Sequence, residues 1–278
     1  MRTRILKVND VELEIVEAGE GNADRLLLVH GFGGSKEDFT HYLPRLGATG
    51  WHVVAPDLRG HGGSSKPQDE AAYSLAGIAE DLNALLDALG WDTAVVLGHS
   101  MGGMVVQLFA LAHAPRVSAL VLMDTSHKMP DHVDASMVEA GQAVVRDGGT
   151  ELLVEIGKRA TEPGPLDTIP YLEMCKADPA YKAWSDDKTL NFTGPAWVSL
   201  AGEMSTQADR LDALATLTMP TLVIVGEMDD GFYKQCVAMS EAIPNARLAV
   251  IPGGGHSPQF EAPTPWWDAL RSFLDTNR

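Results

Sequence analysis

The hydrophobic positions of the chain change from an alternating pattern to short continuous runs after the first 18 residues. Residues 5–18 alternate apolar and polar side chains on both sides of Asn9-Asp10, which predicts a half-exposed antiparallel hairpin. The later runs are apolar throughout, as in strands that are buried on both faces of a parallel sheet. Six such runs predict a substantial sheet: Leu26–Val29, Val53–Ala55, Ala94–Leu97, Ala119–Met123, Leu222–Val225 and Leu248–Ile251.

Segments with helical periodicity separate these runs. Over residues 75–89, leucine, isoleucine and alanine recur at intervals of three and four, and Gly90 follows as a stop signal. A stripe of large apolar residues over 266–274 predicts a last helix, with Thr264 as its cap and Pro265 at its first position. Strands that alternate with helices predict an α/β domain whose parallel sheet has right-handed crossovers.

The interval from about 125 to 218 breaks this alternation, because it contains polar and helical pieces but no convincing buried strand. We therefore expect residues 1–124 and 219–278 to form the core domain and residues 125–218 to form a helical insertion. The insertion carries several methionines and aromatic residues, Trp184 and Trp197 among them. Each of these side chains either packs the insertion onto the sheet or lines a pocket, and the sequence leaves both roles open.

Composition narrows the range of partners and compartments. The chain of 278 residues has a formal net charge of −17, which disfavours binding to nucleic acid and to anionic membrane surfaces. Its two cysteines, Cys175 and Cys236, form neither a disulfide framework nor a Cys-x-x-Cys motif. The N-terminus lacks the apolar stretch of a secretory signal, and no apolar run approaches the roughly 20 residues of a membrane span. These features predict a cytoplasmic protein that acts on a small molecule.

Ser100 lies in Gly98-His-Ser-Met-Gly102, between a predicted buried strand and a predicted helix. Gly-x-Ser-x-Gly in this context is typical of a nucleophile elbow, a sharp turn that exposes the serine hydroxyl. The two glycines leave room for the neighbouring strand and helix to come close. The alternative interpretation is that Ser100 only caps the helix at 101–113, and the two roles are compatible.

A serine hydroxyl needs a base to take its proton, and that base needs a carboxylate to orient it. His256 follows the last predicted strand, at the sheet edge that also presents Ser100, whereas His99 is expected to point away from its neighbour Ser100. Asp229 follows the preceding strand at the same edge and is the preferred carboxylate. Asp124 ends another strand at this edge and stays a rival for that role.

The negative oxygen of a tetrahedral intermediate also needs hydrogen-bond donors. The backbone N–H of Met101 begins the helix after Ser100, and the glycine-rich loop His30-Gly-Phe-Gly-Gly34 is predicted to supply the N–H of Phe32. A nucleotide-binding loop is the competing interpretation of these glycines. The segment Gly31–Lys36 lacks the pattern of either a dinucleotide fingerprint or a P-loop, which disfavours that interpretation.

Four motifs together make the chain resemble the α/β-hydrolase superfamily over nearly its whole length. They are His30-Gly-Phe-Gly33, Asp57-Leu-Arg-Gly-His-Gly-Gly-Ser64, Gly98-His-Ser-Met-Gly-Gly103 and Gly255-His-Ser-Pro-Gln-Phe-Glu-Ala-Pro263. The resemblance implies that the loop of residues 57–64 is mainly structural and that residues 125–218 form a cap over the active site. Haloalkane dehalogenases and epoxide hydrolases, whose nucleophile is an aspartate, are disfavoured because position 100 is serine.

The sequence as a whole predicts a serine hydrolase of small to medium, mainly apolar carboxylic esters or lactones. In this interpretation Ser100, Asp229 and His256 form the triad, Phe32 and Met101 form the oxyanion hole, and no metal or organic cofactor takes part. Within the same fold, a hydrolase of carbon–carbon bonds in ring-cleavage diketones, a perhydrolase and a hydroxynitrile lyase stay open. A slow or non-catalytic ligand-binding receptor is the alternative from another class.

Overall fold

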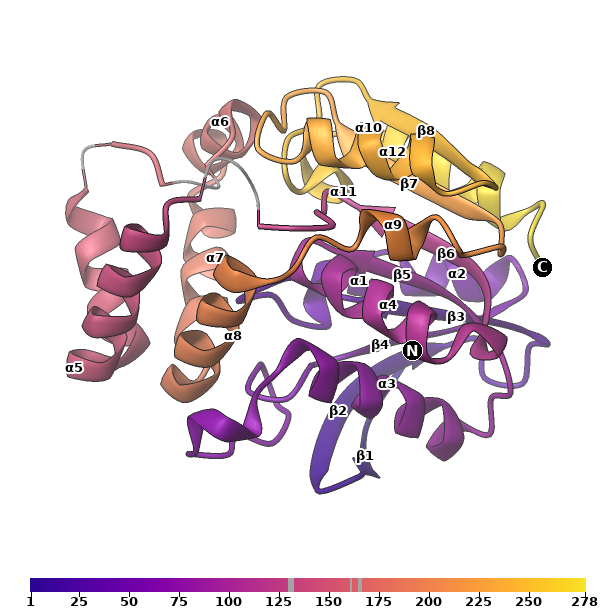
Figure 1. Ribbon diagram of the computed structural model, residues 1–278, viewed down its shortest axis with the longest axis horizontal. Coiled ribbons are helices and arrows are strands. Elements are labelled where there is room, and N and C mark those ends of the chain that lie inside the picture. The colour runs from indigo at the N-terminus through magenta and orange to yellow at the C-terminus, as the bar shows by residue number, and fades with distance from the viewer. Residues whose placement is uncertain (130–132, 161, 165–166) are drawn as a thin grey trace.

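The computed structural model describes residues 1–129, 133–160, 162–164 and 167–278, and its centre is an eight-stranded sheet (Figure 1). Neighbouring strands follow the order β1-β2-β4-β3-β5-β6-β7-β8. The strands are β1 (Arg2–Val8), β2 (Val11–Ala18), β3 (Asp24–Val29), β4 (Trp51–Pro56), β5 (Ala94–His99), β6 (Val117–Met123), β7 (Thr221–Gly226) and β8 (Ala246–Ile251).

The predicted hairpin and parallel sheet are both confirmed. β1 pairs with β2, and β2 with β4, in antiparallel fashion, whereas every later pairing is parallel. Asn9 makes the tight turn of the hairpin with a positive φ of 48°. The prediction that all six apolar runs are buried on both faces is wrong for β8, where Val250 is 37% exposed. β8 lies at the edge of the sheet, so only one neighbouring strand covers it.

Helices cover both faces of the sheet, as the alternating pattern predicts. The helices are α1 (Glu37–Thr40), α2 (Leu43–Ala48), α3 (Leu75–Leu89), α4 (Met101–Ala112), α5 (Ala135–Arg159), α6 (Ile169–Ala177), α7 (Pro179–Leu190), α8 (Gly194–Thr206), α9 (Leu211–Leu214), α10 (Tyr233–Ala242), α11 (Pro258–Glu261) and α12 (Pro263–Leu274), with 3₁₀ turns η1 (Glu70–Ala72) and η2 (Ala114–Arg116). One apolar cluster joins the sheet to α3, α4 and α10, and a second joins it to α2 and α12.

The boundaries of two predicted helices can be compared with the structure. α3 covers the predicted range and ends at Gly90, whose φ of 68° is left-handed. The predicted start of the last helix is wrong, because α12 begins at Pro263 and Ala262 occupies the cap position. Thr264 therefore lies inside the first turn. Both Pro263 and Pro265 fit the first turn of α12. The backbone nitrogens of a helix's first turn have no intrahelical acceptor, so a proline there loses no hydrogen bond.

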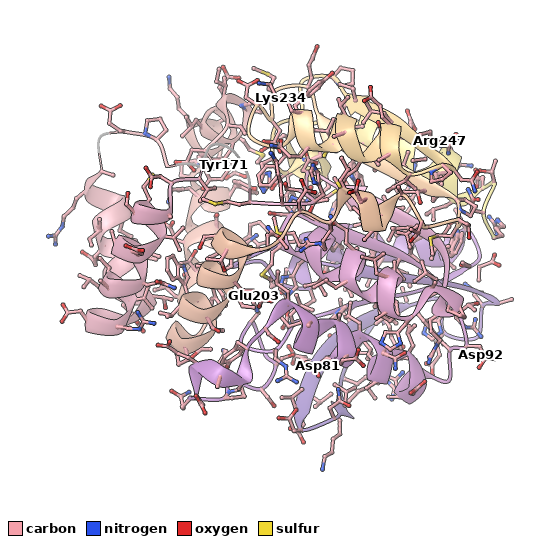
Figure 2. All side chains as sticks on the ribbon, in the orientation of Figure 1. Asp81, Asp92, Tyr171, Glu203, Lys234 and Arg247 are labelled. Carbon is pink, nitrogen blue, oxygen red and sulfur yellow. The ribbon has the colours of Figure 1, made fainter. Side chains whose placement is uncertain are left out.

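Helices α5–α8 form the insertion between β6 and β7 and gather at one side of the molecule, on the left in Figure 1. Side chains anchor the insertion to the core. Glu203 of α8 accepts a hydrogen bond from the N–H of Leu75, the first residue of α3 (2.7 Å; Figure 2), and Arg146 of α5 pairs with Glu70 (2.8 Å). Among the described residues, no helix is both long enough and apolar enough to cross a membrane.

The loop after β4 is held by a buried ion pair, which accords with the structural role expected for residues 57–64. Asp57 is fully buried, and its carboxylate accepts hydrogen bonds from the Lys36 Nζ (2.8 Å), the Lys36 N–H (2.7 Å) and the Gly63 N–H (2.7 Å). Glu14 also pairs with Lys36 (2.6 Å) but is partly exposed. The loop thus depends on Asp57 for three of its hydrogen bonds.

Replacement of Asp57 by alanine is expected to lower the free energy of unfolding by about 3–5 kcal/mol, because the Lys36 cation loses its buried partner. Urea denaturation of the variant measures this loss. Glu14→Gln is the matched control, with an expected loss of about 1 kcal/mol or less, because this carboxylate is partly solvated. Equal losses in both variants would contradict a special role for the buried pair.

Candidate active site

The turn between β5 and α4 holds Ser100 in a strained conformation. Its φ of 54° and ψ of −120° are rare for a residue with a side chain, and its N–H donates to the Met123 carbonyl (2.9 Å). A Cβ atom on Gly102 would lie 2.4 Å from the His30 carbonyl oxygen, and one on Gly98 would lie 2.3 Å from the Gly102 carbonyl oxygen. Both glycines are therefore needed for the close approach of the loop, strand and helix around Ser100.

The side chain of Ser100 faces His256, which in turn faces Asp229. The Ser100 Oγ lies 3.0 Å from the His256 Nε2, and the His256 Nδ1 lies 2.9 Å from the Asp229 Oδ2. All three residues are buried. The Ser100 hydroxyl makes no capping hydrogen bond to α4, so the interpretation as a helix cap alone does not describe this side chain. The geometry is the one that a nucleophile, a base and an orienting carboxylate require.

Two carboxyl groups, from Asp229 and Asp124, lie next to each other behind His256. Burial works to raise the pKa of Asp229, but the charge and hydrogen bond of His256 outweigh it, and this pKa is lowered. Burial raises the pKa of Asp124 well above its usual range, and the charge of Asp229 raises it further. The two opposite shifts favour a neutral Asp124 beside an ionised Asp229.

Asp124 is fixed from the side of the sheet. It has a positive φ of 44°, and its Oδ1 accepts a hydrogen bond from the Gly226 N–H (2.8 Å) at the end of β7. The structure therefore brings Asp229 to the imidazole of His256 and places Asp124 against Asp229. Of the two carboxylates that the sequence leaves in competition, Asp229 is the one hydrogen-bonded to that ring.

The loop after β3 lies against the same turn. A Cβ atom on Gly31 would lie 3.0 Å from the Cβ of Ser100, so the glycine permits this approach. Gly34 donates its N–H to the Gly31 carbonyl (3.1 Å), and His61 of the 57–64 loop accepts the Gly33 N–H (3.3 Å). Within the part of the chain that the structure describes, the N–H groups of Phe32 and Met101 make no hydrogen bond to protein, which leaves two donors near Ser100.

Two residues beside His256 were not predicted as part of the site. The buried His99 Nε2 lies 2.6 Å from the His256 carbonyl oxygen, and burial lowers the pKa of His99 to about 3. A neutral His99 therefore donates this hydrogen bond and fixes the His256 backbone. Phe232 stacks on the imidazole of His256 at 4.7 Å between ring centres. The sequence places His99 next to Ser100 in the elbow motif, but it gives no signal of the contact between His99 and His256, which are 157 positions apart.

An apolar hollow of about 400 Å³ opens on one side of Ser100. The core contributes Met104 and Phe232 to its wall, and the insertion contributes most of the other lining side chains, including Met137, Val138, Trp197, Ala201 and Met204. Hollows of this size and lining hold the apolar part of a small ligand. Trp197 thus faces a pocket, a point that the sequence leaves open.

A second hollow of about 250 Å³ also reaches Ser100, and we call it the polar hollow because charged and hydroxyl side chains form part of its wall. Phe32, Leu153 and Trp197 line both hollows, as Ser100 does, and so form the boundary between them. The polar hollow is further lined by Asp38, His99, Ser185, Lys188, Thr189, His256 and Ser257. Phe192 lines this hollow too, so Ser100 lies between an apolar hollow and one whose wall is part polar and part apolar.

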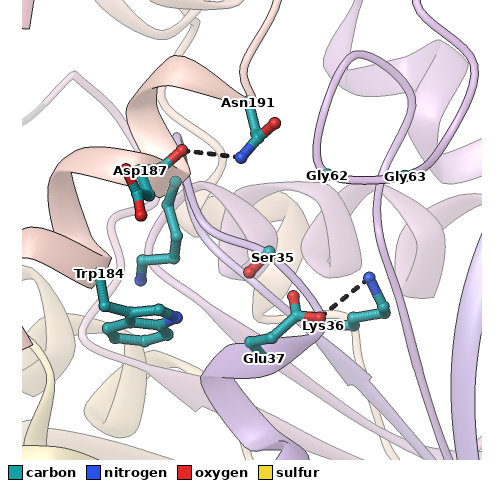
Figure 3. Close-up of a pocket in the computed structure, with 9 residues that line it drawn as sticks. Ser35, Lys36, Glu37, Gly62, Gly63, Trp184, Asp187 and Asn191 are labelled. Atoms are coloured by element: carbon teal, nitrogen blue, oxygen red, sulfur yellow. Dashed lines mark hydrogen bonds and ion pairs between the residues drawn. The ribbon is translucent and has the colours of Figure 1, made fainter.

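Lys188 also lines a third hollow, which opens toward the surface between the insertion and the core (Figure 3). Figure 3 shows Trp184 and Asp187 of α7, with Asn191 directly after this helix, on one side and Ser35, Glu37 and the turn at Gly62 and Gly63 on the other. Trp184 thus faces this outer hollow and not Ser100. Among the described residues, no group of three or more His, Cys, Asp or Glu side chains is arranged to hold a metal ion.

Known proteins resemble this chain in sequence and in fold. A family model described as alpha/beta hydrolase fold matches residues 24–263. Lipase 1 of Psychrobacter immobilis is 27% identical over 95% of this chain and 83% of its own length. A thermophilic esterase from Thermogutta terrifontis has a TM-score of 0.82 and 28% identity, with 99% of both chains covered. Epoxide hydrolase A of Mycobacterium tuberculosis is 42% identical, but the match covers 43% of this chain and 37% of that enzyme.

Proposed function

The chain belongs to the alpha/beta hydrolase fold family, and we propose that it is a serine hydrolase that cleaves a small to medium, mainly apolar carboxylic ester or lactone. The observation that carries the proposal is the hydrogen-bonded series from Ser100 through His256 to Asp229, buried at the junction of two hollows. The likeness to a lipase and to an esterase, each above 25% identity over most of the chain, supports the same class.

In the acylation step, the His256 Nε2 takes the proton of the Ser100 hydroxyl while the Ser100 Oγ attacks the ester carbonyl carbon. The carbonyl π electrons move onto oxygen, and the N–H groups of Phe32 and Met101 stabilise the resulting oxyanion. When the tetrahedral intermediate collapses, the bond to the leaving oxygen breaks, and that oxygen takes the proton from His256. Ser100 then carries the acyl group as an ester.

Deacylation repeats these steps with water. His256 takes a proton from water, the water oxygen attacks the acyl carbon, and Ser100 Oγ leaves and regains its proton from His256. Asp229 stays ionised throughout and stabilises the imidazolium, which its lowered pKa favours. A neutral Asp124 behind it, hydrogen-bonded to Asp229, would keep the carboxylate in place without adding a second negative charge.

The partial likeness to an epoxide hydrolase does not carry over to the proposed reaction. Attack of a serine oxygen on an epoxide carbon would form an ether, which has no carbonyl carbon for water to attack and would block turnover. Attack on an ester forms an acyl-serine, which water hydrolyses by the same acid–base steps. A serine at the nucleophile position is therefore productive for acyl compounds.

Side chains of α5 and α8 support the proposal that residues 125–218 form a cap over this site. Trp197 and Ala201 of α8 and Leu153 of α5 line the hollows that meet at Ser100. A cap of this kind would exclude water from the acyl group and define its length. We propose these bounds for the cap and residues 1–124 and 219–278 for the catalytic core.

The two ends of the substrate are distinguished by His256. The leaving oxygen must take its proton from His256, which lines the polar hollow and is not among the described residues that line the apolar hollow. The leaving group would then occupy the polar hollow and the acyl chain the apolar one. In this assignment, the apolar hollow alone determines which acyl-chain length the enzyme prefers.

A series of nitrophenyl esters of increasing acyl length tests the proposal. We expect kcat/KM to rise by about tenfold or more to an optimum as each added CH₂ is buried, and then to fall when the chain exceeds the hollow. Ala201→Phe, which fills part of the apolar hollow, is expected to move the optimum to a shorter acyl chain. Ala183→Phe on the exposed face of α7 is the matched control and is expected to leave the optimum where it is.

A fluorophosphonate probe tests the nucleophile independently of the substrate chosen. We expect it to modify Ser100, which mass spectrometry of the labelled peptide identifies. Absence of both labelling and ester hydrolysis would contradict the proposal. Labelling of Ser100 without ester hydrolysis would instead favour the carbon–carbon bond hydrolase, which product analysis on a ring-cleavage diketone would then test.

A further inference from the structure

We propose that the polar hollow beside Ser100 selects the alcohol part of the substrate, and that this part is a compact, uncharged polyol. The inference rests on the proposed function and adds the chemistry of the leaving group to it. The substrate class would then be monoesters in which an apolar acyl chain is joined to a polyol through one oxygen. The argument depends on the charged and hydroxyl side chains that line this hollow.

An ion pair between the insertion and the core lines this hollow. The Lys188 Nζ of α7 is 2.6 Å from the Asp38 Oδ1 of α1, and their side chains are 16% and 6% exposed. The Lys188 ammonium also lies 4.0 Å from the centre of the Trp184 ring. Lysine has three N–H donors, so donors beyond the one shared with Asp38 are available for a ligand.

Hydroxyl groups stand on the same helix, one turn before and directly after Lys188. Ser185 and Thr189 both line the polar hollow, and the Ser185 Oγ lies 3.4 Å from the Tyr171 hydroxyl. A hydroxyl both donates and accepts hydrogen bonds, as a polyol does. Together with Lys188 and Asp38, these side chains offer donors and acceptors in the same small space.

The charged and hydroxyl side chains of this hollow disfavour other leaving groups of similar size. An anionic leaving group would meet the buried Asp38 carboxylate, and a cationic one would meet Lys188, whereas the pair as a whole is neutral. An apolar alcohol would displace water from the ion pair and the hydroxyls without replacing its hydrogen bonds, which is costly. An uncharged alcohol with additional hydroxyls satisfies these groups and avoids both penalties.

The outer hollow provides a route for such a leaving group. Lys188 lines both the polar hollow and the surface hollow of Figure 3, so this side chain forms the boundary through which the leaving group would pass. The walls of the outer hollow are also polar and charged, with Asn191, Asp187 and Glu37 among them. A polyol released from the acyl-enzyme would pass along hydrogen-bonding groups on its way to solvent.

The test compares two esters of the same acid that differ only in the added hydroxyls: 1-monohexanoyl glycerol and propyl hexanoate, both used below their solubility limits. We expect kcat/KM to favour the glycerol ester by at least about tenfold in the unmodified protein, the effect of two hydrogen bonds of ordinary strength. The double variant Asp38→Asn/Lys188→Met removes the ion pair without leaving a buried charge unpaired. In this variant we expect the ratio to fall to threefold or less.

Two controls keep the outcome specific. Thr189→Val removes one hydroxyl at nearly constant size and is expected to lower the ratio by a smaller factor than the double variant does. Ala201→Phe, in the apolar hollow, is expected to change the hydrolysis of both esters alike and so to leave the ratio unchanged. Thermal unfolding establishes that each variant is folded.

Hydrolysis of both esters with a ratio near one, or a ratio that the double variant retains, would overturn the inference and leave the proposed function intact. Failure to hydrolyse either ester, together with absence of phosphonate labelling, would overturn both.

Discussion

Replacement of Ser100 by alanine is expected to lower kcat for nitrophenyl ester hydrolysis by about 10⁶-fold and to leave KM within a few-fold of its original value. The variant loses the atom that attacks the carbonyl carbon, whereas the hollows and the two free N–H donors at Phe32 and Met101 stay in place. Some acceleration over water is still expected from these groups. Steady-state rates at saturating and limiting ester separate the two parameters.

The matched control is Ser240→Ala, which removes a hydroxyl that bonds only within α10, at the Val237 carbonyl (2.8 Å). It is expected to keep full activity. If both variants are purified alike, a loss of activity in Ser100→Ala alone rules out a contaminating esterase. A double variant that combines Ser100→Ala with His256→Ala should be no slower than Ser100→Ala alone, because the two groups act as one unit. Activity retained in Ser100→Ala would mean that the nucleophile lies elsewhere.

Most of the fold is predictable from the sequence because its pattern is local. Runs such as Leu26–Val29 and Ala94–Leu97 are apolar throughout, and only a strand covered on both faces needs this composition. The error at β8 has a physical reason: Leu248–Ile251 is as apolar as the other runs, but its place at the sheet edge depends on strand order, which periodicity does not contain. The start of α12 was missed because Pro263 and Pro265 fit a first turn equally well.

The core side of the site is predictable for a related reason. Ser100, Asp229 and His256 each follow a predicted strand, and the carboxyl ends of parallel strands meet at one edge. His99 and Phe232 were missed because their contacts with His256 depend on how two loops pack. Lys188 was missed because its partner, Asp38, is 150 positions away, and a helical insertion without a motif gives no signal of which face it turns to the core.

Replacement of Asp229 by asparagine is expected to lower kcat by about 10⁴-fold, because the amide can present its NH₂ group to the imidazole and favour the wrong tautomer of His256. Asp124→Asn is the matched comparison, and we expect its kcat to fall by less than about tenfold. The raised pKa of Asp124 favours its neutral form, and asparagine keeps both a donor toward Asp229 and an acceptor for the Gly226 N–H. Similar large losses in both variants would mean that Asp124 also carries charge during the reaction.

The stability of Asp124→Asn provides a second measurement that does not depend on a substrate. Because the folded-state pKa of Asp124 is raised, the stability linked to its protonation is fully present below the unfolded-state pKa of about 3.9 and is lost as the pH rises toward the folded-state value. Asparagine cannot ionise and does not suffer this loss. The free energy of unfolding of Asp124→Asn, minus that of the unmodified protein, should therefore increase from pH 4 to pH 7 in urea denaturation. A difference that stays constant over this range would mean that the Asp124 carboxyl is ionised in the folded protein, and that its hydrogen bond to Asp229 is not made through its own proton.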